Sequence, residues 1–492
     1  MTVKQVKKVV IAGGGTAGWM AAAALSKVLG KRLDIYLVES DEIGTVGVGE
    51  ATIPTLHFYN QVLGLDEKKF LLETHGTFKL GIQFENWRDI GVDYLHAFGN
   101  TGTDFWAAGF HNFWLKGTHL GVNHDFGDYC LERRAAESGK FAHLPKNGLK
   151  YAYHLDATAY GKLLRKYSEK LGVTRVEGKI SSVKTCENSG FIESLVMESG
   201  QVVDGDLFID CTGFRGLLIE QTLHSGYEDW SHWLPCDRAM PAQTHSSGPP
   251  DPYTRAVAHT AGWRWRIPLQ HRVGNGLVYC SRYMSDDEAQ TVLLESIDAE
   301  PITDPRVIRF QTGRRLKQWN KNCIAVGLSS GFLEPLESTS IHLIQQSVLR
   351  LIKMFPIEGV KQVDVDEFNR QTHASFEDVR DFIVLHYKAT ERDDTAFWRH
   401  CRNMEVPDSL ARRLNLFTET GRLFLADNEL FTDSWLQVMI GQGVMPSAYH
   451  AVVDTMDEDE LRSFLEQIRT KIKRTVEQMP THAEYLGKFC GA

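Results

Sequence analysis

Short apolar runs and glycine-containing turns alternate at the start of the chain. The apolar run 9–12 is followed by the turn 13–18 and by an alanine-rich segment, 19–29. A second run, 34–39, is again largely apolar. Runs this short are typical of strands, and the longer alanine-rich segment favours a helix. The pattern therefore predicts a strand–helix–strand unit with two parallel strands.

Two later apolar runs, 206–210 and 322–327, lead into glycine-containing turns, and a helical pattern begins near Ser338. One parallel sheet built from all these runs would be discontinuous in sequence, and the predicted fold class is α/β, doubly wound and Rossmann-like. The expected ranges of this module are 1–80, 150–225 and 285–355. A second lobe of mixed sheet and helix is expected from 80–150, 225–285 and 355–492. Its features are strands in 80–120 and 225–285, helices from about 340 onward, and a loop at 246–252.

Residues 77–84 alternate strictly, which predicts one strand with two different faces. The apolar face carries Phe78, Leu80, Ile82 and Phe84, and the other face carries Lys79. From this pattern alone, Lys79 is expected to be an ordinary solvated lysine.

The composition narrows the class of protein. The 492 residues are 42% hydrophobic and 24% charged, with a net charge of −9 and no basic stripe, which disfavours a nucleic-acid partner. The eight cysteines form no CxxC pair and no cluster with histidine, so neither a structural metal site nor a disulfide framework is expected. No apolar run is long enough for a signal peptide or a membrane span. A cytoplasmic enzyme is the expected class.

The turn 13–18 has the form GxGxxG between a strand and a helix. Gly13 permits the tight turn, Gly15 lets the backbone approach a pyrophosphate, and Gly18 lets the helix pack closely on the strand. Thr16 and Ala17 lie in the same turn, the N-terminus of the helix that follows faces the anion, and Glu39 can bind the adenosine ribose. The alternative is a purely structural turn. FAD is favoured over NAD because two further glycine-ended strands follow, as in FAD-binding folds of the aromatic hydroxylase type.

Residues 263–268 read Trp-Arg-Trp-Arg-Ile-Pro, which places Trp263 and Trp265 on one side of a strand. Ordinary core packing is the simpler interpretation of such a pair. The WxWxIP pattern, however, resembles the signature of flavin-dependent halogenases of the tryptophan halogenase type. Four other segments are similar to blocks of that family: 47–54 (GVGEATIP), 210–218 (DCTGFRGLL), 274–279 (GNGLVY) and 331–341 (GFLEPLESTSI). The resemblance extends to about residue 390.

The resemblance implies an FADH2-dependent halogenase that uses oxygen and chloride or bromide. Its substrate would be an electron-rich aromatic, such as an indole or tryptophan, attacked by hypohalous acid. It also implies a separate flavin reductase, and homodimers are common in the family. Further cofactor-binding positions implied by the resemblance are Ala51, Val176, Leu328 and Ile341. The alternative is a flavin-dependent aromatic monooxygenase, but such enzymes usually have Gly-Asp where this chain has Gly327-Leu328.

By the same resemblance, Lys79 and Glu337 are the catalytic residues. Lys79 would polarise hypohalous acid by hydrogen bonding or form a haloamine, and the sequence leaves both possibilities open. Glu337 would bind the oxidant or accept the proton that the arene loses, whereas Glu334 is expected to be structural. Trp263 and Trp265 would keep the organic substrate away from the flavin.

Thr339 and Ser340 take the place of the family's halide-binding pair, at the start of a predicted helix. Ser340 replaces the family's glycine. If that glycine is needed for a positive φ or for room, halide affinity would fall or bromide would be preferred. His96 and Phe98 resemble residues that line the indole pocket. Within 431–449 no group that would grip a free amino acid is identifiable, so a simple indole, a pyrrole, a phenol or a larger molecule is also expected.

Overall fold

The computed structural model describes residues 5–44, 49–105, 107–145, 148–425 and 429–491, and it contains two compact units. Unit 1 comprises Met1–Gly76, Leu155–His232 and Arg309–Glu377. Unit 2 comprises Thr77–His154, Trp233–Ile308 and Asp378–Ala492. The last boundary falls inside the long helix α9 (Gln362–Lys388). Each unit is therefore assembled from three separate stretches of the chain.

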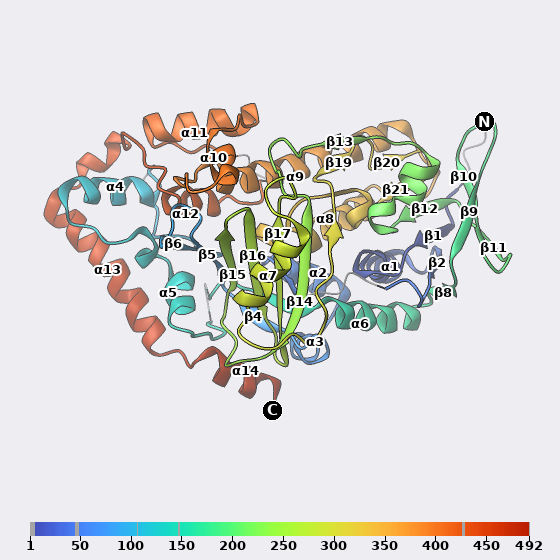
Figure 1. Ribbon diagram of the computed structural model, residues 1–492, viewed down its shortest axis with the longest axis horizontal. Coiled ribbons are helices and arrows are strands. Elements are labelled where there is room, and N and C mark those ends of the chain that lie inside the picture. The colour runs from blue at the N-terminus through green and yellow to red at the C-terminus, as the bar shows by residue number, and fades with distance from the viewer. Residues whose placement is uncertain (1–4, 45–48, 106, 146–147, 426–428, 492) are drawn as a thin grey trace. The chain divides into compact units, whose positions relative to one another are not determined.

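Unit 1 is built around a six-stranded sheet. Its order is β20 (Trp319–Asn320), β21 (Cys323–Ala325), β12 (Leu207–Asp210), β1 (Lys8–Ala12), β2 (Asp34–Glu39) and β8 (Thr174–Glu177). All neighbours pair in parallel except β20 and β21. The helix α1 (Thr16–Leu29) lies against β1 and β2, and it also packs on α6 (Ala157–Lys170) and α8 (Ser340–Lys353) (Figure 1). The predicted strand–helix–strand unit and the parallel sheet are confirmed.

The opposite face of this sheet is covered by other strands. Val10 and Phe208 share a core with Ile192 and Leu195 of an antiparallel sheet formed by β9 (Ile180–Thr185), β10 (Ile192–Met197) and β11 (Val202–Asp204). Alternation along β1 places Val10 on this face and Val9 on the face of α1. A small sheet, β13 (Tyr227–Asp229), β19 (Gly313–Arg315) and β22 (Gly331–Phe332), and the helices α2 (Leu56–Leu63) and α3 (Glu67–Thr74) complete the elements that concern the site.

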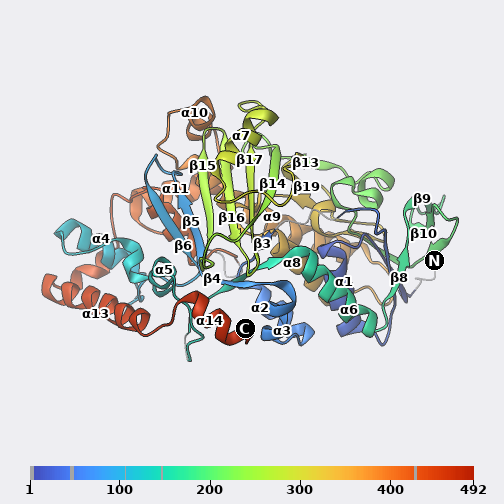
Figure 2. The ribbon, with the colours of Figure 1, turned by 60° about the horizontal axis from the view of Figure 1, so that its bottom comes forward.

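Unit 2 contains a seven-stranded sheet whose central strands lie side by side in Figure 2. Its order is β18 (Ile308–Arg309), β14 (Arg238–His245), β17 (Arg272–Tyr279), β16 (Gly262–Pro268), β15 (Thr254–His259), β5 (Gly81–Glu85) and β6 (Asp93–Ala97). A separate strand, β4 (Thr77–Lys79), pairs with β7 (Ala152–Asp156). The helices are α4 (Phe110–Leu120), α5 (Leu131–Glu137), α7 (Asp286–Ser296), α10 (Ala396–Asn403), α11 (Asp408–Thr420), α12 (Ser434–Gly441), α13 (Glu458–Glu477) and α14 (His482–Cys490). The predicted helical C-terminal part is confirmed.

Two expectations for this part of the chain were wrong. Residues 77–84 do not form one strand, because Leu80 interrupts them: its amide donates to the Pro252 carbonyl, 2.7 Å away, and its carbonyl accepts from Phe98. The chain thereby leaves β4 and joins the large sheet as β5. Residues 80–120 are not strand-rich throughout, since α4 occupies their end. The expected loop at 246–252 lies between β14 and β15, outside any helix or strand.

All eight cysteines are free thiols, as expected. Among the residues placed by the structure, no helix combines the length and the apolar character needed to cross a bilayer, and no group of acidic, histidine and cysteine side chains could hold a metal ion.

Candidate active site

The glycine turn after β1 is closely packed at two positions and open at a third. Gly13 has φ +107°, and a Cβ there would lie 2.2 Å from the Cys211 carbonyl oxygen. A Cβ on Gly18 would lie 1.9 Å from the Gly13 oxygen. Gly15 is the N-cap of α1, and no atom lies within 4 Å of the place its Cβ would take. The open space therefore lies beside the helix N-terminus, where the amides attract an anion, and this arrangement fits a pyrophosphate.

Glu39, at the end of β2, is held by side chains that the sequence did not indicate. Its Oε1 accepts from Arg175 Nε at 2.6 Å and from Arg165 at 3.4 Å, and its Oε2 accepts from the Trp19 indole at 3.3 Å. Arg175 comes from β8 and Arg165 from α6. Their position beside Glu39 therefore depends on how these elements are arranged next to β2. The carboxylate is thus fixed beside the glycine turn, with Oε2 the less engaged oxygen for a ribose hydroxyl.

The other expected cofactor positions also belong to unit 1. Thr16 and Ala17 form the first turn of α1, and a Cβ on Gly327 would meet the Ala17 Cβ at 2.8 Å, which brings the turn 327–329 against that helix. Ala51, Val176 and Ile341 are buried, and Leu328 is half-buried. Ala51 follows Glu50, and burial raises the pKa of the Glu50 carboxyl to about 7. Gly47 and Val48 of the same motif lie outside the described residues.

A tight turn precedes α8 and carries the expected glutamate and halide residues. Glu334 precedes the Pro335–Glu337 turn, Glu337 is its last residue, and both side chains are fully buried. Ser338 has φ +59°, and Thr339 is the N-cap of α8. The Thr339 hydroxyl is buried and has no hydrogen-bond partner among the described residues. A buried, unsatisfied hydroxyl at a helix start fits a bound anion.

Ser340 adopts ordinary helical backbone as the first residue of α8, and positive φ occurs at Ser338 instead. The serine therefore fits this position without backbone strain. Farther along α8, His342 is buried, and burial lowers its pKa to about 4. Its Nδ1 lies 2.8 Å from the Thr55 hydroxyl.

Lys79 lies in β4 and is fully buried, contrary to the solvated lysine that the alternating pattern favoured. Its ammonium lies 5.1 Å from the centroid of the Phe98 ring, within cation–π range. The nearby His154 is also buried, and its pKa falls well below the usual value because burial and then the Lys79 charge disfavour protonation. The structure thus brings together two of the predicted residues, Lys79 and Phe98, in a desolvated environment.

His96 and Phe98 are part of an aromatic cluster. His96 is buried in β6, with its ring 6.3 Å from that of Phe98 and 5.7 Å from that of Phe382 in α9. Phe382 in turn stacks on Phe431 at 4.0 Å. Gln437 of α12 holds this segment in place, since it accepts from the Ala97 amide and donates to the Gly99 carbonyl. The sequence missed these C-terminal contributors, because a helical apolar pattern does not reveal which strand it will cover.

Trp263 and Trp265 lie on β16, are both buried, and have ring centroids 6.1 Å apart. The Trp265 ring fills the space over Gly276 of the neighbouring strand, where a Cβ would lie 2.0 Å from it. Trp263 packs toward Trp87, with centroids 6.4 Å apart. The expected pair on one side of a strand is present, and Gly276 is the residue that makes room for it.

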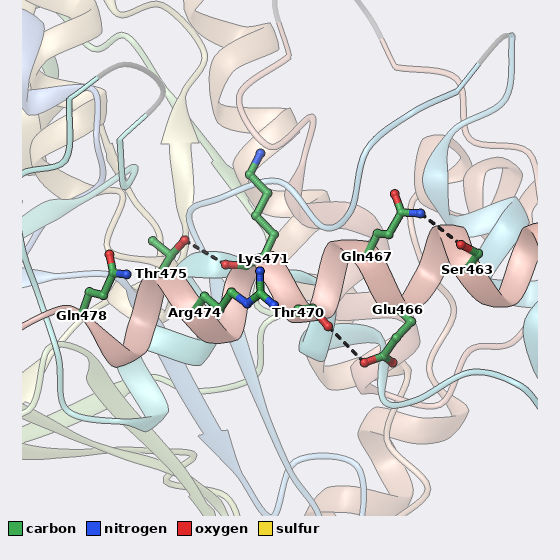
Figure 3. Close-up of a pocket in the computed structure, with 8 residues that line it drawn as sticks. All are labelled: Ser463, Glu466, Gln467, Thr470, Lys471, Arg474, Thr475 and Gln478. Carbon is green, nitrogen blue, oxygen red and sulfur yellow. Dashed lines mark hydrogen bonds between the residues drawn. The ribbon is translucent and has the colours of Figure 1, made fainter.

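A groove follows the outer face of α13, but none of the predicted site residues lines it. Figure 3 shows its side chains, several of which bond along the same helix, such as Gln467 to Ser463 and Thr470 to Glu466. All the residues that line it come from α13 and its end. The candidate site residues are instead the groups described above: the glycine turn and residues 334–340 belong to unit 1, and Lys79, the aromatic cluster and the tryptophan pair belong to unit 2.

Comparisons with known proteins agree over nearly the whole chain. Residues 8–458 match the family model described as tryptophan halogenase. The chain belongs to the tryptophan halogenase family. It is 34% identical to the 7-chloro-L-tryptophan 6-halogenase KtzR of Kutzneria sp., over 98% of this chain and 99% of that protein.

Solved structures of flavin-dependent halogenases superimpose closely on this chain. Xcc4156, a flavin-dependent halogenase from Xanthomonas campestris, is 56% identical with a TM-score of 0.98, covering 99% of each chain. BrvH, a flavin-dependent halogenase from Brevundimonas sp. BAL3, is 43% identical with a TM-score of 0.95, also covering 99% of each chain. The Rossmann-like α/β fold with a second lobe, and the enzyme class of flavin-dependent halogenase, are thereby confirmed.

Proposed function

We propose that this tryptophan halogenase family member uses FADH2, oxygen and chloride or bromide to halogenate an electron-rich aromatic substrate. The observation that carries the proposal is the buried ammonium of Lys79 beside the Phe98 ring. A lysine side chain is rarely buried completely unless its ammonium has a functional role or an interaction partner that compensates its charge. We assign flavin binding to unit 1 and binding of the aromatic substrate to unit 2.

FAD would be held by Gly13, Gly15 and Gly18 with the amides of Thr16 and Ala17, and by Glu39 at the ribose. Ala51, Val176, Leu328 and Ile341 would complete the contacts. When bound, the reduced flavin supplies, together with oxygen, the oxidising power that turns halide into an electrophilic halogen. The open space at Gly15 and the fixed carboxylate of Glu39 support this assignment.

The halide would bind at Thr339 and Ser340, where the buried hydroxyl and the α8 amides provide hydrogen-bond donors. Trp263 and Trp265 would exclude the organic substrate from the flavin, as a barrier of large buried rings. Halide binding and exclusion of the substrate both require that these groups stay in place. Thr339 and Ser340 lie at the start of α8, and Trp263 and Trp265 lie within β16, so regular elements hold them.

Lys79 would act on hypohalous acid as a hydrogen-bond donor. The arene carbon forms the new carbon–halogen bond as the bond between halogen and oxygen breaks, and the hydroxide that leaves takes a proton from the ammonium and becomes water. The arene then loses its proton, which Glu337 would accept. Proton exchange with solvent restores both groups. A haloamine on Lys79 would give the same products.

The substrate would lie against His96 and Phe98, which with Phe382 and Phe431 provide faces and edges for a flat ring. Free tryptophan, the substrate named for several relatives, and smaller indoles are both consistent with this surface. We also propose that a separate flavin reductase supplies FADH2, and that the enzyme forms homodimers.

The test is to supply the purified protein with enzymatically reduced FAD, oxygen, bromide and a panel that includes indole and tryptophan. A brominated product by mass spectrometry is expected, and none with Lys79→Ala, which should bind FAD as the wild type does. A hydroxylated product would instead indicate a monooxygenase. Full product formation by Lys79→Ala would remove the catalytic assignment.

A further inference from the structure

The strand that carries Lys79 is unusually dependent on distant groups. β4 has three residues, pairs only with β7 in the part of the chain that the structure describes, and lies at the edge of its sheet. An edge strand presents amides that no neighbouring strand satisfies, and such an amide destabilises the fold when it is buried without a partner. Phe78, the residue before Lys79, is fully buried. Its amide therefore needs a partner from elsewhere in the fold.

His482, the first residue of α14, provides that partner. The Phe78 amide donates to His482 Nε2 at 3.2 Å. On its other side, His482 Nδ1 lies 2.8 Å from the Pro250 carbonyl, which can only accept. Nδ1 must therefore carry the proton, and Nε2 is left as an acceptor. Burial lowers the pKa of His482 to about 4, so that the neutral ring this pairing requires is the form present near neutral pH.

Other bonds fix the residues on either side of Lys79. Before it, the Thr77 hydroxyl donates to the Pro268 carbonyl at 2.8 Å, so toward His154 Nδ1, at 2.9 Å, it can only accept. His154 Nε2 then accepts from the Thr254 hydroxyl at 2.9 Å. After Lys79, the amide of Leu80 donates to the carbonyl of Pro252. The loop 246–252 thus bonds directly to Leu80, the residue after β4, and reaches Phe78 of β4 through His482.

The Phe78 side chain attaches the other face of β4 to the same helix. Its ring stacks on Phe141 at 4.1 Å and meets Tyr485 and Phe489 of α14 edge-on, at 5.9 and 5.7 Å. Alternation places the Lys79 side chain on the face opposite to this cluster. The C-terminal helix therefore holds β4 from behind the lysine, by one hydrogen bond and by contacts of the Phe78 ring with the rings of His482, Tyr485 and Phe489.

We propose that His482 is a positioning residue for halogenation, which sets the place of the Lys79 ammonium through the backbone of Phe78. The inference rests on the proposed function of Lys79. A displacement of about 1 Å in a reacting group can cost about a hundredfold in rate. Loss of the Phe78–His482 bond should thus affect the transfer of halogen to the substrate, and should leave flavin binding in unit 1 unchanged.

The experiment compares His482→Gln with His482→Asn in the full-length enzyme. The glutamine amide reaches the place of Nε2 and can accept from Phe78, while it loses Pro250. The asparagine amide reaches the place of Nδ1 and can bond Pro250, while it loses Phe78. Each variant removes one hydrogen bond from the same buried site, so the pair controls for general destabilisation, which thermal unfolding measures directly.

The readouts are FAD affinity, the KM for indole, and the brominated product formed per FADH2 oxidised. A water-soluble thioether in the assay traps hypobromous acid that escapes. His482→Asn is expected to lower the product yield per FADH2 by about tenfold or more, with more oxidised thioether and with FAD affinity and KM unchanged. His482→Gln should stay within about threefold of the wild type, since it keeps the bond to Phe78.

Lys79→Met in the same assay separates the two hypotheses. If the wild type gives no brominated product, the proposed function is wrong, and if Lys79→Met halogenates indole as the wild type does, the proposed role of Lys79 is wrong. If Lys79→Met loses product but the Asn and Gln variants give equal yields, only the role of His482 is overturned. If both variants at His482 are too unstable to purify, Thr254→Val replaces them. This variant removes the donor to His154, which bonds Thr77, the residue at the start of β4. It should also lower the yield of brominated product per FADH2, and an unchanged yield overturns the positioning model.

Discussion

Gly15→Ala should separate flavin binding from folding. Gly15 has φ −70° and ψ −176°, which alanine adopts without strain, and no atom lies within 4 Å of the new methyl group. Alanine restricts the unfolded chain, which favours folding by about 0.4–1 kcal/mol, but it is a poorer N-cap than glycine by a similar amount. The two effects offset each other, so the free energy of unfolding without flavin should change by less than about 1 kcal/mol.

Flavin binding gives a reason for glycine at this position. If the pyrophosphate occupies the space at Gly15, the methyl group forces it away from the α1 amides, and a hydrogen bond to a charged group is worth about 1.5–3 kcal/mol. That loss corresponds to an affinity lower by about tenfold to a hundredfold. Fluorescence titration with FAD measures the affinity, and urea unfolding of the flavin-free protein measures the stability.

Gly18→Ala is the matched control. Its methyl group would lie 1.9 Å from the Gly13 oxygen, a backbone atom that cannot turn aside. We expect a loss of stability of about 1–3 kcal/mol or more, from overpacking between α1 and the turn. Wild-type FAD affinity in Gly15→Ala would refute the assignment of the pyrophosphate to this space, whatever the result for Gly18→Ala.

Three further predictions concern other parts of the site. Because burial raises the Glu50 pKa to about 7, the native state favours the protonated carboxyl, and the free energy of unfolding should fall by at most about 3 kcal/mol as the pH rises from about 4.5 to 7. Urea unfolding at several pH values measures this dependence. Glu50→Gln should flatten it, and the same pH dependence in the variant would contradict the assignment to Glu50. Ser340→Gly should change the ratio of chloride to bromide turnover if the Ser340 side chain limits room for halide, whereas identical ratios would remove that argument. Gly276→Ala should displace Trp265, change tryptophan fluorescence and cost about 1–3 kcal/mol, and an unaltered melting curve would show that the ring can move aside.

The parts of the fold that could be predicted are those whose signal is local. The apolar runs of β1, β2 and β12 and the glycines of the turn at 13–18 specify strand, turn and helix from a few adjacent residues. The helix α1 begins at Thr16 and not at Trp19 as predicted, because Gly15 already serves as its N-cap. The helical C-terminal part was likewise visible from its periodicity.

The parts that could not be predicted depend on contacts between distant segments. Alternation in 77–84 suggested one strand, but Leu80 bonds to Pro252 and Phe98 and so divides it. The same alternation favoured an exposed Lys79, because a period of two shows that a strand has two faces and does not show which face other elements will cover. Arg165 and Arg175, which hold Glu39, could not be assigned without the order of β2 and β8.

The backbone of the turn 338–340 alters the argument about halide specificity. A glycine at position 340 would matter if that residue had a positive φ, but the residue with positive φ is Ser338, at +59°, and Ser340 is the first residue of α8. The backbone amides at the start of α8 are therefore available with serine as with glycine. The remaining difference between serine and glycine is the volume of one side chain at the edge of the proposed halide site. Any difference in turnover between chloride and bromide must then come from the volume of that side chain or from the Thr339 hydroxyl. The hydroxyl is the stronger candidate for a contact with the ion, because it is buried without a hydrogen-bond partner among the described residues.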